Sequence, residues 1–380
     1  MSVTVTQPQH SDYTITLSSA DQEQLSPQWQ QLESVAVPHF FLSWHWMHTW
    51  LETCAPDAQL IQIRYQDEIV GLGLFTCHPE TRHRWLKSRV IRLHRTGNTS
   101  KDQIWIEYNG LLLHPQHQTT APAALMSYLI QQTWWDEFEL GATETAVLSG
   151  YQAESLTRFD KWSSPVFGVD LTQLRLAGKS FLDTLSRNTR YQINRSQKRY
   201  ESQASLELLC LSSPDEILEH WPNLSELHKT KWGSQPEQSG FANPEFVRFH
   251  EILLKSSHNN GAIELLLLRS GNSVLGYLYN FVYRNRVYFY LSALTQPTDP
   301  KLKPGLLLHT LAIEHYAHRG LAYYDFMGGD ARYKASLAPC TGELRLVTLQ
   351  RPRMRLRLEQ LARTAKQHLQ ELLPQHDRTN

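Results

Sequence analysis

Short hydrophobic segments, separated by turn-forming residues, recur along the whole chain. In the first half their pattern predicts several strands, two of which form a hairpin across the turn Gln66-Asp67-Glu68. These strands are expected at residues 13–17, 60–65, 69–76, 104–107 and 138–140. Helices are expected after Asp21, across the tryptophan-rich residues 40–54, and over residues 122–133, where Pro122 suits a first helical turn.

The second half continues this alternation of strands and helices. Strands are expected at residues 206–211, 262–268, 274–283, 287–294, 322–326 and 343–349. Helices are expected around residues 217–231, 244–255 and 304–318. Gly320 is a suitable C-cap for the last of these helices, and Ser180 with Asp183 forms the capping pattern of a further helix.

Three short stretches of the first half match stretches of the second half, in the same order. The matched pairs are 69–72 with 274–277, 121–125 with 303–307, and 138–140 with 324–326. We interpret this order as an internal duplication. The second copy has Gly305 where the first has Ala123, and its polar segment 328–334 has no counterpart after Leu140. If one half is active, we expect it to be the second.

Length and composition fit this interpretation. A chain of 380 residues is too long for one ordinary core, and 41% hydrophobic with 19% charged residues is typical of a soluble globular protein. The formal net charge of zero argues against a general nucleic-acid coat, so DNA is not an expected partner. The chain shows neither a secretory signal nor an apolar run near the ~18 residues that span a bilayer. A cytoplasmic location is therefore expected.

Cysteine and histidine give no metal or disulfide pattern. The 4 cysteines are scattered and form no C-x-x-C pair, which favours reduced thiols. The 18 histidines are dispersed, and the pair His315 and His318 lacks a third ligand at a fixed offset. No metal site is predicted.

The start of the 304–318 helix is a candidate anion site. N–H groups at a helix start are unpaired and the helix dipole favours anions there, while Gly305 leaves the first turn without a side chain. A pyrophosphate could approach closely, with Lys303 near its charge. The candidate cofactor-binding residues are Lys303, Pro304, Gly305, Leu306 and Leu307. An ordinary helix opened by proline has the same pattern.

The candidate catalytic residues follow the strand at 322–326. Asp325 or Asp330 could take a proton from an amine or hydroxyl nucleophile, and Tyr333 could return one to a thiolate leaving group. Lys334 adds a cation to the same segment. In the alternative interpretation, the acids satisfy turn amides and the tyrosine packs.

Three further features could bind substrates or partners. An arc of one basic helix suits phosphates or RNA, although a solvated surface is the commoner explanation for such a run of charges. The arc consists of Arg187, Arg190, Tyr191, Asn194, Arg195 and Lys198. His228 and Trp232 lie four apart and could line an acceptor cleft, or be structural. The basic, amphipathic tail 351–380 could contact anionic lipid or a partner, or pack on its own protein.

In order and spacing, these motifs resemble the GNAT superfamily, specifically its cellulose-biosynthesis-associated (CelD/BcsL-like) branch, and more remotely the Fem aminoacyltransferases. The resemblance is carried by residues 186–188 with the basic helix, His228, Trp232, 249–250, Gly276, 303–305, 324–330, Tyr333 and Lys334. It covers residues 181–349 well and the first half more loosely.

The resemblance implies an α/β (α+β) fold of two tandem GNAT-like domains, each a mixed, curved sheet flanked by helices. Residues 1–170 would form a degenerate first domain, 171–350 the acyltransferase domain, and 351–380 the tail. It also implies direct acyl transfer from a thioester. GNAT proteins typically carry an Arg/Gln-x-x-Gly-x-Gly/Ala turn, whereas 303–307 retains one glycine, so CoA and another acyl carrier both stay open.

We therefore expect an N- or O-acyltransferase that uses an acyl-CoA, acetyl-CoA foremost. Its acceptor would be a sugar, an amine or a cell-envelope or polysaccharide precursor. The expected catalytic residues are Asp325, Asp330, Tyr333, Lys334 and His228, and the expected substrate-binding residues are Arg187, Arg190, Tyr191, Arg195 and Trp232. A Fem-like transferase using aminoacyl-tRNA is one alternative, against which the zero net charge weighs. A non-catalytic GNAT scaffold in a biosynthetic complex is the other.

Overall fold

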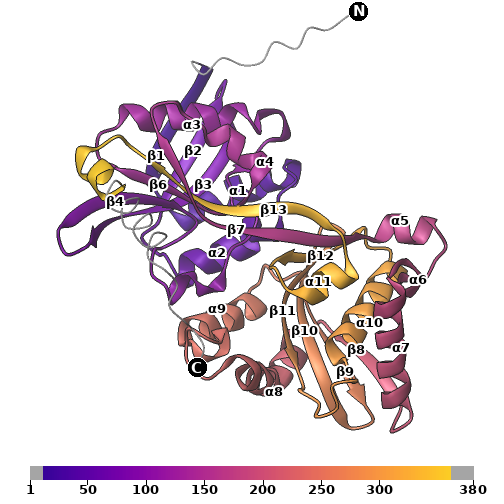
Figure 1. Ribbon diagram of the computed structural model, residues 1–380. Helices are drawn as coiled ribbons and strands as arrows, with labels where there is room; N and C mark the ends of the chain where they lie inside the picture. The colour runs from indigo at the N-terminus through magenta and orange to yellow at the C-terminus, as the bar shows by residue number, and fades with distance from the viewer. Residues whose placement is uncertain (1–11, 361–380) are drawn as a thin grey trace, which may run out of the picture.

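The computed structural model describes residues 12–360, which form one mixed sheet with helices on both faces (Figure 1). The strand order is β1-β2-β3-β4-β6-β13-β7-β12-β11-β10-β9-β8, and β5 pairs with β3 outside this path. No helix among these residues is long and apolar enough to cross a membrane. Most of the predicted tail, residues 361–380, lies outside the described residues, and residues 354–360 are helical.

The first unit contains most of the elements before residue 171. Its strands are β1 (Tyr13–Ser19), β2 (Gln59–Tyr65), β3 (Glu68–Arg82), β4 (Leu86–Leu93), β5 (Leu112–Leu113), β6 (Glu137–Glu144) and β7 (Thr157–Asp170). Its helices are α1 (Gln22–Val35), α2 (Trp44–Thr53), α3 (Thr120–Gln131) and α4 (Thr145–Leu148). Asp21 and Ser43 cap α1 and α2, because their side chains accept from first-turn N–H groups.

The second unit follows. Its strands are β8 (Leu206–Leu211), β9 (Ile263–Ser270), β10 (Ser273–Tyr283), β11 (Arg286–Leu294), β12 (Tyr323–Gly328) and β13 (Cys340–Gln350). Its helices are α5 (Leu171–Leu176), α6 (Phe181–Thr184), α7 (Arg187–Glu201), α8 (Pro214–Trp232), α9 (Pro244–Lys255), α10 (Pro304–His318) and α11 (Arg332–Leu337).

The predicted duplication appears in the order of elements. The run β2-β3-β4-α3-β6 of the first unit repeats as β9-β10-β11-α10-β12 in the second. Each run contains one parallel strand pair, β4 with β6 and β11 with β12, within otherwise antiparallel pairing. The mixed α/β architecture of two similar units is therefore confirmed. A short helix follows the last strand of each run, α4 and α11, so the segment after β6 does have a topological counterpart.

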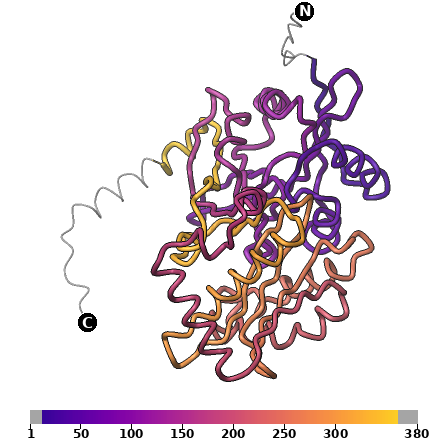
Figure 2. Tube along the Cα trace, turned by 90° about the vertical axis from the view of Figure 1, so that its right-hand side faces the viewer, coloured from indigo at the N-terminus to yellow at the C-terminus, as the bar shows by residue number. Residues whose placement is uncertain are grey.

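The two units exchange their last strands. β7 belongs to the first half of the chain but pairs with β12 of the second unit. β13 ends the second half but pairs with β6 of the first unit, and with β7 between them. Figure 1 shows β7 and β13 as long strands running side by side through the middle of the molecule, and Figure 2 shows the yellow end of the chain against the upper unit. Each unit's sheet is thus completed by its neighbour.

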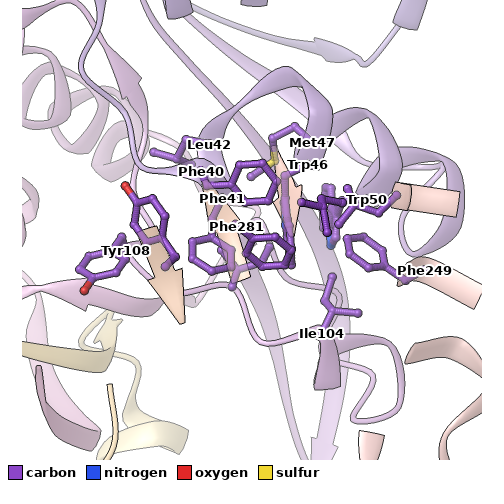
Figure 3. Packing of buried hydrophobic residues seen from close by; sticks show 14 of the residues in the cluster. Phe40, Phe41, Leu42, Trp46, Met47, Trp50, Ile104, Tyr108, Phe249 and Phe281 are labelled. Atoms are coloured by element: carbon purple, nitrogen blue, oxygen red, sulfur yellow. The ribbon is translucent and has the colours of Figure 1, made fainter. Parts of the chain in front are cut away.

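The tryptophan-rich segment forms a core that both units share. Helix α2 packs on α9 of the second unit, where the rings of Trp46 and Phe249 lie 4.8 Å apart. The ring of Phe40 stacks on Phe281 of β10 at 4.5 Å (Figure 3). Separate apolar clusters surround α3 in the first unit and α10 in the second. The units are therefore joined by a common core as well as by the sheet.

The prediction of a strand at residues 104–107 is wrong. Residues Lys101–Ile104 form a 3-10 turn, and Trp105 and Tyr108 both adopt positive φ, which interrupts an extended backbone. Glu107 makes a single isolated bridge to Ala142 of β6. This irregular segment places its side chains between the two units.

Candidate active site

β11 and β12 part soon after they begin. They pair over Arg286–Tyr288 and Tyr323–Asp325, whereas β11 stays paired with β10 as far as Leu294. The carboxyl-terminal parts of the two strands therefore run apart. The chain that leaves β11 leads into α10, and the chain that leaves β12 leads into α11. The predicted cofactor and catalytic segments thus begin at the same end of this parallel pair.

The first turn of α10 is open to a ligand in two respects. Its N-cap residue, Lys303, makes no side-chain capping hydrogen bond, so that no cap side chain occupies the amides. A Cβ on Gly305 would lie 2.8 Å from Leu294 Cδ1, so glycine also lets the helix approach the end of β11. Pro304 occupies the first helical position, as predicted, and is buried.

Helix α7 braces the loop before this turn. The Ser196 hydroxyl accepts a hydrogen bond from Lys303 N at 2.9 Å, and Arg199 forms an ion pair with Asp299. Arg195 Nη2 donates to Lys301 O at 3.5 Å. The later part of the predicted basic arc therefore lies beside the α10 turn.

The earlier part of the arc lies further along α7. Arg190 pairs with Asp183 at 3.5 Å, with its Nη2 also 3.4 Å from Leu185 O. Arg187 and Tyr191 are exposed. These three residues lie near the start of α7. Ser196 and Arg199, which contact the loop before α10, lie near its end.

Asp325 is held at the point where the strands part. Its Oδ1 accepts from Met327 N at 2.7 Å and its Oδ2 accepts from the Tyr108 hydroxyl at 2.7 Å. Burial raises the pKa of Asp325, although Arg286, whose Nη1 lies 3.6 Å from Oδ2, opposes the rise. The carboxyl group thus shapes the bulge at Met327, where φ is 59°, and is also a stronger base than an exposed aspartate.

Lys334 closes the end of β12. Its buried ammonium donates to Phe326 O at 2.7 Å and to Gly328 O at 2.5 Å. A Cβ on Gly329, where φ is 137°, would lie 2.7 Å from Nζ. Burial lowers the pKa of Lys334, and the nearby carboxyl groups of Glu107 and Asp325 oppose this. Lys334 therefore explains the glycine at 329, whereas a Cβ on Gly328 would lie 3.2 Å from Glu107 Oε1.

Tyr333 and Asp330 differ in their surroundings. Asp330 is exposed. The Tyr333 ring stacks on His309 of α10, with centroids 5.4 Å apart, and burial raises the pKa of its hydroxyl. Tyr333 therefore lies on the α10 face of the sheet.

His228 and Trp232 lie at the end of α8, which packs against β11 on the other face of the sheet. His228 Nδ1 lies 2.8 Å from Ser239 Oγ, and burial together with Lys231 lowers its pKa to about 4. Trp232 is 53% exposed. Burial, with Lys334 and Lys231, lowers the pKa of His309 to about 3.

The structure adds residues from the first unit that sequence analysis missed. Glu107 Oε2 accepts from Gly328 N at 2.7 Å, and Oε1 accepts from Trp105 Nε1 at 3.0 Å. Burial raises the pKa of Glu107 to about 7, although the Gly328 amide and Lys334 oppose it. His39 stacks on Tyr108 with ring centroids 3.9 Å apart. Because residues 104–107 were predicted to be a strand of the first unit, sequence analysis did not place Glu107 in this cluster.

The first unit fills its equivalent place with its own chain. Asn109 N donates to Ala142 O and Asn109 Nδ2 donates to Leu93 O, both at 2.9 Å. Leu93 and Leu140 are the last paired residues of β4 and β6. A Cβ on Gly141 would lie 2.7 Å from Asn109 Nδ2. The parting of β4 and β6 is thus bridged by hydrogen bonds from Asn109.

No group of three or more histidine, cysteine, aspartate or glutamate residues within 12–360 could hold a metal ion.

One comparison with known proteins gives a family match, and that match lies in the second unit. Residues 187–335 match the family model described as an acetyltransferase (GNAT) domain. A comparison with curated proteins gives no match.

Three solved structures share the fold of the whole chain. A crystal structure of FemX is 12% identical, with 84% of this chain and 95% of that chain covered and a TM-score of 0.50. The structure of L-PGS from Bacillus licheniformis is 11% identical (88% and 94% covered, TM-score 0.52). A conserved protein of unknown function from Bacteroides thetaiotaomicron is 11% identical (86% and 97%, 0.51). The domain match in the second unit supports a transferase, and the solved structures show the shared fold.

Proposed function

We propose that the second unit is an acyl-CoA-dependent N- or O-acyltransferase, with acetyl-CoA as the first donor to test. The observation that carries this proposal is the uncapped first turn of α10, which carries Gly305 and stands beside the parting of β11 and β12. The acceptor would attack the thioester directly. A sugar or a polysaccharide precursor as acceptor, and the narrower CelD/BcsL-like family, rest on the sequence resemblance.

The donor phosphates would lie at the start of α10. The amides of Gly305 and Leu306 and the helix dipole favour a pyrophosphate, and the absence of a side chain at Gly305 lets it approach. The Leu307 amide already donates to Lys303 O at 3.1 Å. Lys303 and Arg195 supply positive charge from two sides of the loop, which α7 holds in place. Trp232 and the earlier arginines of α7 are too far along their helices to be assigned to the same phosphates.

The acid and base chemistry would come from residues of β12 and of α11, which follows it. The raised pKa of Asp325 makes its carboxylate a better proton acceptor than an exposed aspartate such as Asp330. The raised pKa of Tyr333 keeps its hydroxyl protonated, which a proton donor to the leaving thiolate requires. The same raised pKa makes the hydroxyl a weaker acid. Lys334 would keep the strand end in shape. His228 would face the acceptor side, from α8.

Isothermal calorimetry with acetyl-CoA and with longer acyl-CoAs tests the proposal. We expect Gly305→Glu to weaken donor binding at least roughly tenfold, ~1.4 kcal/mol, because a carboxylate would stand where the phosphates bind. Ala123→Glu, the same change at the matching position of α3, is the control and should leave donor binding unchanged. The proposal fails if the wild-type chain binds no acyl-CoA, or if Gly305→Glu binds it as well as the control.

A second candidate is a transferase that uses aminoacyl-tRNA. It is favoured by the fold shared with the structures of FemX and L-PGS, and by the exposed basic residues of α7. Binding would then weaken steeply with salt, because phosphate contacts release counterions. A gel shift with charged tRNA at low and high salt distinguishes it from the acyl-CoA proposal.

A further inference from the structure

A hairpin tip and a short helix lie beside each other on the first unit. The tip, residues 83–85, joins β3 to β4, and the helix spans residues 354–360, beyond β13. Glu359 of the helix connects them, because its carboxylate lies 3.1 Å from Arg82 Nη2 and 3.3 Å from His83 Nε2. Both segments lie at the left of the molecule in Figure 1. We refer to residues 82–89 and 351–360 together as the hairpin–helix surface.

Three large apolar side chains of this surface are left to solvent. Trp85 at the hairpin tip is 65% exposed, and Met354 and Leu358 of the helix are 70% and 56% exposed. Met354 and Leu358 are four residues apart and therefore share one face of the helix, whereas Leu356 is fully buried beneath it. The outer face of this helix is thus apolar, and no described residue covers it.

The exposed charges of the hairpin–helix surface are all positive. They are Arg84, Lys87, Arg89, Arg355 and Arg357. Glu359, the one acid in the two segments, is buried against Arg82. The neighbouring Asp136 is buried as well, where it accepts from Arg89 N at 2.9 Å and pairs with Arg355. The acids therefore hold the two segments together from within, and the outside of the surface is positive.

We propose that the hairpin–helix surface docks on an anionic lipid membrane. Trp85, Met354 and Leu358 would enter the boundary between headgroups and acyl chains, where an amphipathic indole and long apolar side chains are both stabilised. The exposed arginines and Lys87 would lie among the anionic headgroups, and each would strengthen binding about fivefold. Binding of this kind grows with apolar area and with opposite charge, and the surface presents both.

The same features argue against two other occupants. Nucleic acid would be attracted by the positive charges, but Met354 and Leu358 have no ring on which a base could stack. In a two-fold symmetric dimer built on this surface, the surface would face its own copy, so that like charges would meet. A lipid surface is the partner that satisfies the apolar and the charged side chains together.

The hairpin–helix surface lies apart from the proposed donor site. Four strands, β6, β13, β7 and β12, stand between β4 and β11 in the sheet. Membrane docking therefore involves none of the residues to which we assign the donor or the proton transfers, and this inference does not depend on the proposed function.

Sedimentation of the full chain with lipid vesicles tests the charged part of the surface. We expect binding to vesicles of phosphatidylcholine that contain about one third phosphatidylglycerol, weakened by salt, and little binding to phosphatidylcholine alone. Replacing Arg84 and Arg357 together by glutamine should weaken binding roughly 30-fold, at about fivefold for each charge. The matched control removes two exposed charges from α9, Arg248→Gln with Lys255→Gln, and should leave binding within about twofold of wild type.

Serine variants test the apolar part with the same mixed vesicles. Trp85→Ser and Leu358→Ser should each weaken binding about tenfold, because apolar area no longer leaves water on docking. Leu176→Ser, which changes a leucine of α5 that is 75% exposed, is the matched control and should bind as wild type does. Circular dichroism verifies that each variant is folded, as expected for substitutions of exposed side chains.

Three results would overturn the proposal. The first is a wild-type chain that binds neither kind of vesicle, or both equally well. The second is full binding by Trp85→Ser and Leu358→Ser, which would mean that charge alone attracts the chain. The third is a gel shift of single-stranded RNA that needs Arg84 and Arg357, in the absence of vesicle binding, which would assign the surface to nucleic acid.

Discussion

Glu139 on β6 and Asp325 on β12 occupy matching places in the two units, yet their surroundings shift their pKa values in opposite directions. Glu139 is buried beside Arg95, Lys161 and Arg92, and these cations lower its pKa in spite of burial. Asp325 has Arg286 alone among nearby cations of comparable effect, and burial raises its pKa. One unit therefore uses the carboxylate as the centre of an ion-pair cluster, while the other keeps an acid that can exchange a proton.

The same contrast extends to the backbone around these residues. In the first unit Asn109 bridges the parting of β4 and β6 by hydrogen bonds to Leu93 and Ala142. In the second unit the corresponding strands part beside the start of α10, which carries Gly305 where α3 carries Ala123, although neither helix start has a side-chain cap. Duplication followed by the filling of one copy explains why one fold contains both a filled version of the site and the version to which we assign the proposed function.

The largest expected effect concerns whether either unit can stand without the other. A chain that ends at Ala338 loses β13, and with it the partner of both β6 and β7. We expect this truncation to abolish cooperative folding of both units, because the middle of the sheet would be left with unpaired edges. Urea unfolding followed by circular dichroism measures it. A chain that ends at residue 360 is the control, and a cooperative transition in the shorter chain would show that the first unit folds independently.

A second, smaller effect separates the two acids. Glu139→Gln should destabilise the protein by ~3 kcal/mol, since it leaves three cations around an uncharged amide. Asp325→Asn should cost less, ~1 kcal/mol, because its amide can still accept one of the two hydrogen bonds and no cation cluster is stranded. Activity should respond in the reverse order, with Asp325→Asn the more damaging. Unfolding free energies and kcat for both variants decide this, and equal losses of activity would erase the contrast between the units.

Patterns that are local in the sequence predicted most elements. The bounds of β8, α9 and α10 agree with the prediction, because apolar periodicity, Asn243 or Pro304 at the helix start, and Gly320 at a helix end act over a few residues. β4 and β7 were not predicted. Their sequences alternate with charged residues such as Arg92 and Arg158, whose partners Glu139 and Asp160 become evident in the folded chain.

Sequence analysis predicted the site residues of the second unit and missed those of the first. Asp325, Lys334 and Gly305 were found because they lie in the copy with the distinctive glycines. His39 and Glu107 lie in the copy judged degenerate, and their proximity to β11 and β12 depends on the exchange of β7 and β13. No short-range pattern records which sheet a strand joins, so a site made across that exchange is visible in the structure alone.

The smallest expected effect is a pH dependence that again sets the two regions apart. Burial raises the pKa of Glu107 from 4.5 to about 7 in the folded protein. Since the folded state then binds the proton more tightly than the unfolded state, the contribution of Glu107 to stability is fully present below pH ~4.5 and is lost as pH rises through about 7. The loss has an upper bound of about 3.5 kcal/mol, at ~1.4 kcal/mol for each of the roughly 2.5 pH units between the two pKa values, and the expected loss is well below this bound.

Glu139 works in the other direction. Its lowered pKa stabilises the folded protein above the unfolded value of 4.5, and that contribution is lost as pH falls through the folded pKa. Buried histidines with lowered pKa values, such as His250 and His309, raise the stability of every variant as pH rises toward 6.5, so the test is the difference between variants. Urea unfolding between pH 5 and pH 8 should show wild type losing stability relative to Glu107→Gln as pH rises, with Glu139→Gln keeping the wild-type profile in this range. A difference that does not change with pH would mean that Glu107 does not hold its proton, and that the carboxyl groups between the units resemble those of the first unit after all.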